Sequence, residues 1–198
     1  MGRRRDEKET YVNILGKKVV LRAIEERDLE PLHRWANDSE LGAMLGGWHF
    51  PTSMEDQRRW FASLQQEPLN QRFAIEAGEL GLVGTANLVE IDWKNNHAFT
   101  GMMLGSPETR GKGIGVDAIH AVMRYAFDEL HLERLDASII DYNTASMKAY
   151  CDKCGWVVEG RQRSWYFRKA KYWDRVLVGI TRADYRDLLA RTRYWETP

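Results

Sequence analysis

One glycine-rich turn, at residues 107–116, constrains the fold of this chain more than any other feature. Its sequence is PETRGKGIGV, and it follows an alternating apolar stretch at residues 98–104 that is typical of a strand. After it, apolar residues recur at helical spacing over residues 114–130. The turn therefore leads from a strand into a helix. The first turn of a helix has unpaired N–H groups and a partial positive charge, which predicts a site for a pyrophosphate.

Two common phosphate-binding motifs do not fit this turn. A Walker loop requires Ser or Thr after its Lys, but Lys112 is followed by Gly113. A dinucleotide fingerprint requires a third glycine, where this chain has Val116. What remains is Arg110-x-x-Gly113-x-Gly115, which resembles the pyrophosphate loop of the GCN5-related N-acetyltransferases (GNATs). The resemblance implies acetyl-CoA as co-substrate, and the alternative is a glycine-rich helix entry with surface cations.

A second segment agrees with this resemblance. Residues 143–150 read NTASMKAY and are similar to the N-x-x-S/A-x-x-x-Y segment of the same family. In that family the Asn helps to hold the pantetheine arm of the coenzyme, and the Tyr hydroxyl lies near the thioester sulfur. The resemblance therefore implies that Tyr150 is the general acid that protonates the departing thiolate. The alternative is a helix-capping Asn143 followed by a half-buried Tyr150.

The resemblance covers roughly residues 18–182 and is closest to the RimJ/RimL-like or spermidine acetyltransferase-like branch. It implies an α/β (α+β) fold, with a mixed, mostly antiparallel central sheet of about seven strands that is flanked by helices and splayed at the coenzyme site. The order of elements agrees, because a meander, a helix, a strand, a helix and a hairpin predict a mixed sheet. Residues 11–198 are expected to form a single domain after a disordered, solvated tail at residues 1–10.

Periodicity and turn residues predict the individual elements. Strands are expected at residues 18–22, 72–77, 82–91, 97–104, 134–140, 156–167 and 172–181. Helices are expected to begin at residue 28 and after a Ser53–Asp56 capping box, and to span residues 114–130, 143–154 and 183–193. Residues 37–53 are expected to form a long loop, which in the family overlies the acceptor.

The resemblance implies direct transfer of the acetyl group from acetyl-CoA to a primary amine. The residues expected to bind the coenzyme are Met103, Leu104, Arg110, Gly111, Lys112, Gly113, Ile114, Gly115, Asn143 and Ser146. Backbone groups around Met103 and Leu104 are expected to bind the pantetheine arm and to polarise the thioester carbonyl. No metal is expected at the site.

The group that accepts the proton of the amine is left open by the sequence. Many relatives carry a Glu near the start of the strand before the loop, whereas this chain has Phe99 and Thr100 there. His97, His49, Glu76 and an ordered water are the candidates for the general base. His97 is also consistent with an exposed turn histidine.

The spacing after Tyr150 departs from the family pattern. Tyr150 stands five residues before Gly155, where relatives usually have four. Because the spacing from Asn143 to Tyr150 is kept, the extra residue is expected after Tyr150; otherwise Cys151 would occupy the position of the acid. Cys151 and Cys154 have C-x-x-C spacing, but no further ligands stand at a matching spacing, so both are expected to be core thiols.

Charge and hydropathy restrict the partners. The 29 basic and 29 acidic residues cancel, which argues against nucleic acid or an anionic membrane as a partner. No apolar run approaches the length of a membrane span, and a cytoplasmic location is the simplest expectation. A homodimer or a higher homo-oligomer is left open.

The expected acceptor is a small-molecule amine, either a polyamine or an amino sugar. Asp38, Glu40 and Glu55 could bind a cationic acceptor, or they could be solvated charges at helix ends. One alternative is a ribosomal-protein-type acetyltransferase that modifies a protein N-terminus. Another is a CoA-binding module without catalysis, which the missing Glu would permit.

Overall fold

The structure is a computed structural model that describes residues 13–47, 50–67, 69–109 and 111–196. The predictions made for the tail at residues 1–10, for His49 and for Arg110 fall outside these residues. Within the described part of the chain, no helix has the length and apolar character that a membrane span requires.

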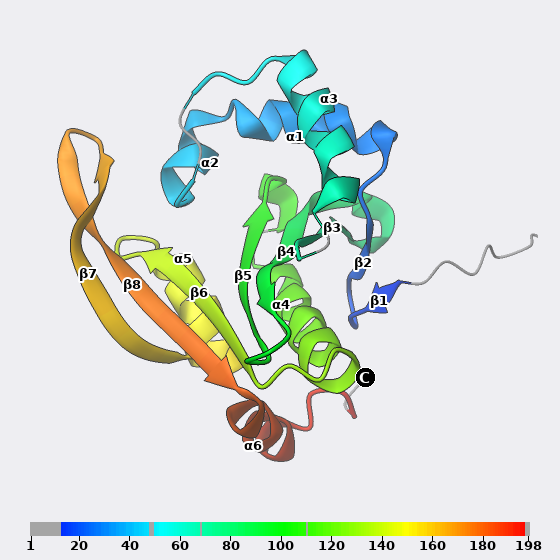
Figure 1. Cartoon of the computed structure of the whole chain (residues 1–198), viewed down its shortest axis with the longest axis vertical. Helices are drawn as coiled ribbons and strands as arrows, with labels where there is room; N and C mark the ends of the chain where they lie inside the picture. Colours follow the sequence, from blue (N-terminus) through cyan, green and yellow to red (C-terminus); the bar gives the residue numbers. More distant parts are fainter. Residues whose placement is uncertain (1–12, 48–49, 68, 110, 197–198) are drawn as a thin grey trace, which may run out of the picture.

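The centre of the molecule is a sheet that has eight strands in the described part of the chain, in the order β1-β2-β3-β4-β5-β6-β8-β7 (Figure 1). The strands are β1 (Ile14–Leu15), β2 (Val20–Ala23), β3 (Gln71–Glu76), β4 (Leu82–Asp92), β5 (His97–Leu104), β6 (Arg134–Ile140), β7 (Val157–Arg168) and β8 (Lys171–Thr181). Only β5 and β6 pair in parallel among these described strands. The prediction of a mixed, mostly antiparallel sheet is confirmed. The strand missing from the predicted seven is β1, which is too short to give a sequence pattern.

The sheet opens between β5 and β6. These two strands pair only where His97–Phe99 lies against Arg134–Asp136. Beyond Phe99, β5 runs on to Leu104 and β6 to Ile140 without pairing to each other. The predicted splay is therefore confirmed. It leaves backbone N–H and C=O groups on both facing edges that a ligand can satisfy.

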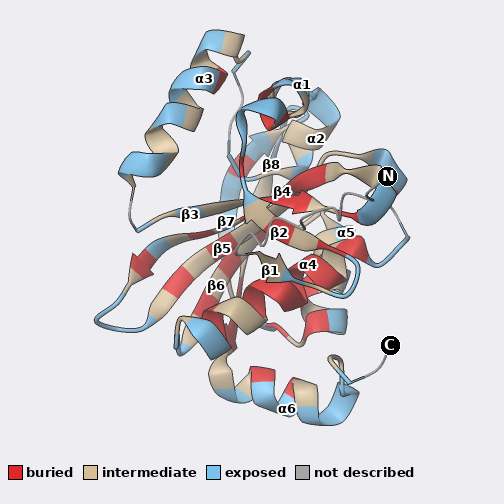
Figure 2. Cartoon of the chain, turned by 90° about the vertical axis from the view of Figure 1, so that its right-hand side faces the viewer, coloured by how far each residue is buried: buried red, intermediate tan, exposed pale blue. Residues whose placement is uncertain are grey.

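Helices cover both faces of the sheet. The helices are α1 (Leu29–Ala36), α2 (Ser39–Met44), α3 (Met54–Ser63), α4 (Ile114–Arg124), α5 (Thr144–Met147) and α6 (Arg182–Thr192). Short 3-10 turns lie at Glu26–Asp28, Leu64–Gln66, Gly78–Leu80 and Pro107–Thr109. The helices α1 and α3 pack on one face through a small cluster around Ala74 of β3. The helix α4 packs on the other face, where Figure 2 shows buried residues in α4 and the central strands.

Residues 37–53 are not a continuous loop, as the sequence predicted. They contain α2, which begins where the Asp38 side chain accepts hydrogen bonds from the N–H groups of Glu40 and Leu41. The three glycines nearby hid this short helix, because glycine is typical of loops. The capping box between Ser53 and Asp56 at the start of α3 is confirmed.

Each of the helices α4 and α5 continues into a π turn, at Tyr125–Glu129 and Lys148–Lys153 respectively. A π turn holds one residue more than an α-helical turn, and such turns are frequent at functional sites. The second π turn begins before Tyr150 and ends at Lys153, so it overlaps the stretch in which the sequence predicts an extra residue. Gly155, with a φ of 73°, then ends the helix as predicted.

Candidate active site

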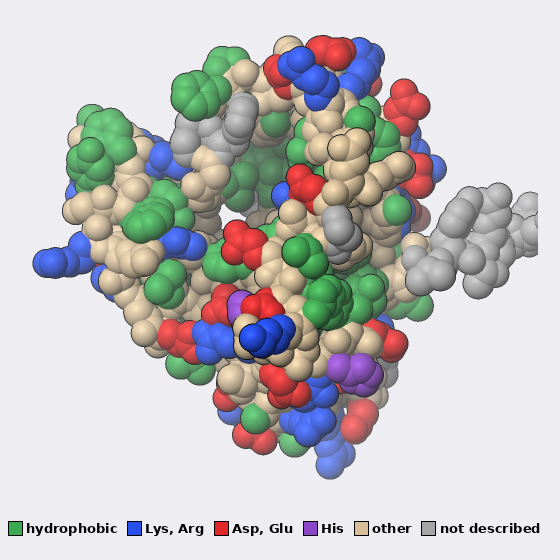
Figure 3. Space-filling view, viewed as in Figure 1, with side chains coloured by type: hydrophobic (Ala, Val, Ile, Leu, Met, Phe, Trp, Pro, Cys, Tyr) green, Lys and Arg blue, Asp and Glu red, His purple; other side chains and the backbone are tan. Residues whose placement is uncertain are grey.

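A cavity of about 790 Å³ lies where β5 and β6 separate, on the face covered by α1 and α3. Its walls come from these helices, from residues 42–47, from β3 to β6, and from the β7–β8 hairpin. In Figure 3 the surface is hollowed between that hairpin and the helices at the top of the view. The cavity is therefore continuous with the opening between β5 and β6, through which a ligand could contact both faces of the sheet.

The predicted pyrophosphate loop lies at one end of this opening. Gly111 and Gly113 have φ values of 73° and 75°, a backbone conformation that favours glycine. Gly113 is the N-cap of α4. A Cβ atom on Gly115 would lie 3.3 Å from the side chain of Leu104, so the first turn of α4 packs against the end of β5. The unpaired N–H groups of that turn are thus presented beside the splayed strand.

Lys18 adds a positive charge to this loop. Its Nζ atom donates a hydrogen bond of 2.8 Å to the carbonyl of Lys112. Lys18 lies in the bend between β1 and β2, far from the loop in the sequence, so no local motif identifies it. Together with Lys112 it would favour a phosphate at the start of α4.

Asp117 holds α4 in position. Its buried carboxylate accepts hydrogen bonds from the N–H groups of Lys17, Lys18 and Val19, at 2.9, 2.6 and 2.9 Å. It also accepts one of 2.6 Å from the Tyr194 hydroxyl. Sequence reasoning missed this residue, because an acidic side chain in the first turn of a helix is ordinarily a solvent-exposed feature. Three of its four contacts tie the start of α4 to the segment between β1 and β2, and the fourth ties it to Tyr194, which follows α6.

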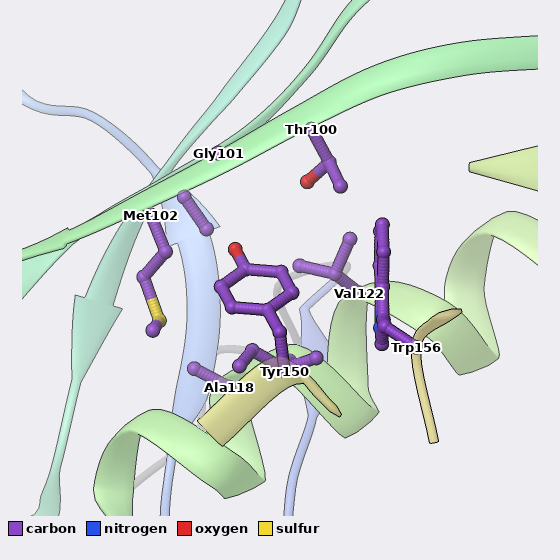
Figure 4. Close-up of a pocket in the computed structure, with 9 residues that line it drawn as sticks. Thr100, Gly101, Met102, Ala118, Val122, Tyr150 and Trp156 are labelled. Carbon is purple, nitrogen blue, oxygen red and sulfur yellow. The ribbon is translucent and has the colours of Figure 1, made fainter. Parts of the chain in front are cut away.

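Tyr150 points its hydroxyl toward β5, near Gly101 and Met102 (Figure 4). The ring is buried and packs edge-to-face on Trp156, with centroids 5.0 Å apart. No residue in the described part of the chain hydrogen-bonds to the phenol oxygen. Burial raises the pKa of the phenol above its ordinary value, so it is protonated at neutral pH. Tyr150 lines the main cavity, and its proton is available to a ligand there.

Asn143 and Ser146 line the same cavity. Asn143 is the N-cap of α5, because its Oδ1 atom accepts a hydrogen bond of 3.1 Å from the N–H of Ser146. Its Nδ2 atom donates one of 3.2 Å to the carbonyl of Met44, and the Tyr142 hydroxyl donates one to the carbonyl of Ala43. These bonds fasten the end of α2 onto the start of α5, beside the cavity.

The side chains of β5 alternate between the two sides of the sheet. Met103 packs with the cluster under α1 and α3, and Phe99 lies on that same side and lines the cavity. Thr100 is buried, and its hydroxyl donates a hydrogen bond of 2.6 Å to the carbonyl of Asn87. Neither Phe99 nor Thr100 can replace the Glu that many relatives carry here as a base.

The structure does not bring two of the candidate bases to the cavity. His97 begins β5 and is partly exposed, with its Nε2 atom 3.7 Å from Asp92. Glu76 forms an ion pair with Arg22, at 2.6 Å. Neither residue lines the cavity that contains Tyr150. Asp38, Glu40 and Glu55 also lie outside its lining and are exposed.

The two cysteines occupy different environments. Cys154 is fully buried beside α4, and burial raises the pKa of its thiol to about 12, so the prediction of a core thiol is confirmed there. Cys151 is half-buried at the edge of the same cluster. Within the residues that the structure describes, no group of three or more His, Cys, Asp or Glu side chains could hold a metal ion.

Comparison with known proteins identifies relatives along most of the chain. The sequence profile of the acetyltransferase (GNAT) domain matches residues 18–157. An uncharacterized N-acetyltransferase of a Bacillus subtilis prophage, YokL, is 28% identical over 170 residues, which are 86% of this chain and 93% of that protein. The putative ribosomal N-acetyltransferase YdaF of B. subtilis is 28% identical over 180 residues, covering 84% of this chain and 93% of YdaF.

Spermidine N(1)-acetyltransferase of Vibrio cholerae is 24% identical over 173 residues, which are 86% of this chain and 97% of that enzyme. The crystal structure of the V. cholerae spermidine N-acetyltransferase in complex with CoA and spermine superposes with a TM-score of 0.79. It covers 85% of this chain and 98% of that one, at 24% identity. At this identity the superposition shows a shared fold.

Proposed function

Because the chain belongs to the GNAT acetyltransferase family, we propose that it moves the acetyl group of acetyl-CoA directly onto the primary amine of a small molecule. One observation carries the proposal. The glycine-rich start of α4 lies at the end of β5, and the Tyr150 hydroxyl points at the same strand, beside the opening between β5 and β6. This spacing suits a long ligand that has a diphosphate at one end and a reactive thioester at the other.

The coenzyme lies along β5 in this proposal. Its diphosphate binds the N–H groups of residues 111–115, with Arg110, Lys112 and Lys18 as counter-charges. The pantetheine arm enters the gap between β5 and β6 and pairs with backbone groups at Met103 and Leu104. Asn143 and Ser146 line the wall on the other side of the arm.

Acetyl transfer then needs two proton movements. The neutral amine attacks the thioester carbonyl, a C–N bond forms, the C–S bond breaks, and Tyr150 donates its proton to the leaving thiolate. A free alkylamine is mostly protonated at neutral pH, so it must lose a proton before it attacks. Because His97 and Glu76 lie outside the cavity, we assign that proton to an ordered water, with His49 as the remaining side-chain candidate.

A small-molecule acceptor is supported by the relative that is named for acetylating spermidine. The relative named as a ribosomal N-acetyltransferase favours a protein N-terminus as the second candidate. The cavity is enclosed on several sides by α1, α3, residues 42–47 and the β7–β8 hairpin, and this enclosure suits a small molecule better than a folded protein.

The proposal is tested by incubating the purified chain with acetyl-CoA and a panel of amines, and by measuring thiol release together with the mass of each amine. The panel includes polyamines, amino sugars, amino acids and N-terminal peptides. Acetylation of an amine with matching release of CoA is the expected result. Tight binding of acetyl-CoA without turnover on any amine would contradict the proposal and favour a CoA-binding module.

A further inference from the structure

We infer that the amine acceptor also carries an anionic group, a carboxylate or a phosphate, which Arg72 and Arg175 bind. This inference rests on the proposed function, because it concerns the acceptor side of the same cavity. Both arginines line that cavity. Arg72 comes from β3 and Arg175 from β8, which lie on opposite sides of the opening between β5 and β6. An anion that contacts both arginines would therefore lie over this opening.

The strand register places both side chains on the acceptor face. Arg72 is paired with Asn87, and Asn87 with Gly101 of β5, so Arg72 shares the face of Gly101. On β8, Val176 belongs to the core under α4, so the neighbouring Arg175 points to the opposite face. The Arg175 guanidinium lies 5.8 Å from the centroid of the Phe99 ring, at the level of β5 where the strands separate.

Neither guanidinium has a carboxylate partner among the described residues. Other arginines of the sheet do: Arg22 binds Asp28 and Glu76, and Arg134 binds Asp136 and Glu159. The Nε atoms of Arg72 and Arg175 are buried and have no hydrogen-bond partner in the described part of the chain. A buried donor without a partner is costly, so an arginine held in this way is typical of a ligand site.

Aromatic rings hold Arg175 in place. Its guanidinium lies 5.0 Å from the centroid of the Trp165 ring, and its Nη1 atom is 3.5 Å from Oε1 of Gln162. These contacts fix the plane of the guanidinium without neutralising its charge. A guanidinium held in one plane can donate two parallel N–H hydrogen bonds to two oxygens of a carboxylate or a phosphate.

The cavity offers little to a polycation. Among the described residues that line it, the one carboxylate belongs to Asp56. That carboxylate already accepts hydrogen bonds from the N–H and the hydroxyl of Ser53, and it pairs with Arg59. Two arginines against one engaged acid give the lining a net positive charge. This charge disfavours a polyamine and favours an amine with a negative group.

The phosphates of the coenzyme are placed too far away to be the partner of Arg175. The diphosphate loop packs at Leu104, whereas Arg175 lies over Phe99, five positions earlier on β5. Five residues of strand span about 17 Å. The anion that Arg175 binds must therefore belong to the other substrate.

The inference is tested with acceptors that differ only in charge. The panel is a series of ω-amino carboxylates of increasing chain length, the matched ω-amino amides, aminoalkyl phosphonates of the same lengths, and spermidine. The expected result is a kcat/KM at least about tenfold higher for one acid or phosphonate than for its uncharged partner and for spermidine. The carboxylate and phosphonate arms distinguish the two kinds of anion.

Variants identify the residues responsible. Arg72→Gln and Arg175→Gln should each lower kcat/KM for the anionic acceptor about tenfold more than kcat/KM for the matched amide, mainly through KM. Arg72→Lys and Arg175→Lys should restore part of the preference, since the charge remains. Arg58→Gln is the matched control, because Arg58 is exposed on α3 and does not line the cavity.

The possible failures are distinguishable. If no amine is acetylated, the proposed function fails. If amines are acetylated but the acid and its amide react equally, or if Arg72→Gln and Arg175→Gln lower kcat/KM for the acid and for the amide equally, the anionic acceptor alone is overturned. Titration of the variants with CoA checks the fold, because the coenzyme should bind with unchanged affinity.

Discussion

The half of the cavity that we propose for the coenzyme (the coenzyme half) and the half that we propose for the acceptor (the acceptor half) are built in different ways. The coenzyme half consists mainly of backbone: the left-handed glycines at 111 and 113, the start of α4 and the free edge of β5. The acceptor half consists of side chains, among them Arg72, Trp165 and Arg175, which come from β3, β7 and β8. Backbone geometry can be kept while sequences diverge, whereas side chains can be exchanged one at a time. If the proposed assignment holds, the coenzyme half determines the reaction, and the acceptor half determines the substrate.

Substitution of Gly113 should have the largest effect, and it should act on the coenzyme alone. In Gly113→Asp, a charge about 4 Å from a phosphate costs about 4 kcal/mol at an effective dielectric constant of 20, which lowers the affinity for CoA about 1,000-fold. Calorimetric titration with CoA measures this loss.

Two matched variants accompany that titration. Gly113→Asn has nearly the same bulk without the charge and should lose much less affinity. Gly81→Asp places an Asp at another glycine with a positive φ, 62°, and open space around it, and should bind CoA normally. Normal binding by Gly113→Asp would show that the diphosphate lies elsewhere.

Substitution of Tyr150 should have the second largest effect, and it should act on turnover and not on coenzyme binding. Tyr150→Phe should lower kcat about 100-fold, because the thiolate loses its proton donor, while the affinity for CoA stays within about twofold. Steady-state kinetics with the best acceptor measure the change. Tyr185→Phe is the control, since Tyr185 is a buried tyrosine outside the cavity. Equal rates for Tyr150→Phe and the unmodified chain would remove Tyr150 as the acid.

Substitution of Trp165 should have a smaller effect, which is limited to the acceptor half of the cavity. Trp165 lines the cavity and supports Arg175, so Trp165→Ala should raise the KM for the amine about fivefold. The KM for acetyl-CoA should not change. Phe167→Ala, on the same strand and similarly exposed but outside the cavity, should leave both constants unchanged. A parallel rise in both KM values would mean that the halves are not independent.

The smallest effect concerns the alkaline side of the pH profile. Burial raises the pKa of Tyr150, so the phenol keeps its proton above its ordinary range. The neutral fraction of the amine rises with pH, so kcat/KM should increase from pH 7 to about pH 10 and then level off. No alkaline fall in kcat/KM should appear up to about pH 10, because the phenol still carries its proton there. An earlier alkaline fall would indicate that another group, with a lower pKa, is the acid.

Local patterns, together with the family resemblance, were enough to predict the fold and to single out the residues that we propose for the coenzyme. The glycine turn before α4 and the Asn143-to-Tyr150 segment are contiguous in sequence, and the residues that form them are neighbours in space. The family resemblance also implied the splay between β5 and β6, which the short pairing at Phe99 confirms. The roles assigned to these residues stay predictions until the coenzyme is bound.

The acceptor half could not be predicted, for physical reasons. Arg72 and Arg175 look like ordinary polar positions on alternating strands, and only the pairing register brings them to one cavity. Lys18 reaches residues 111–115 from the distant bend between β1 and β2, and α2 is hidden among glycines. The π turn at Lys148–Lys153 also lacks a signal in its local composition.

The central claim is that one coenzyme spans the gap between β5 and β6, with its diphosphate at residues 111–115 and its sulfur beside Tyr150. A crystal structure of the full chain with CoA tests it most directly. We predict diphosphate oxygens within hydrogen-bond distance of the N–H groups at the start of α4, and the thiol next to the Tyr150 hydroxyl. Density for CoA at another edge of the sheet, or a thiol remote from Tyr150, would contradict the account.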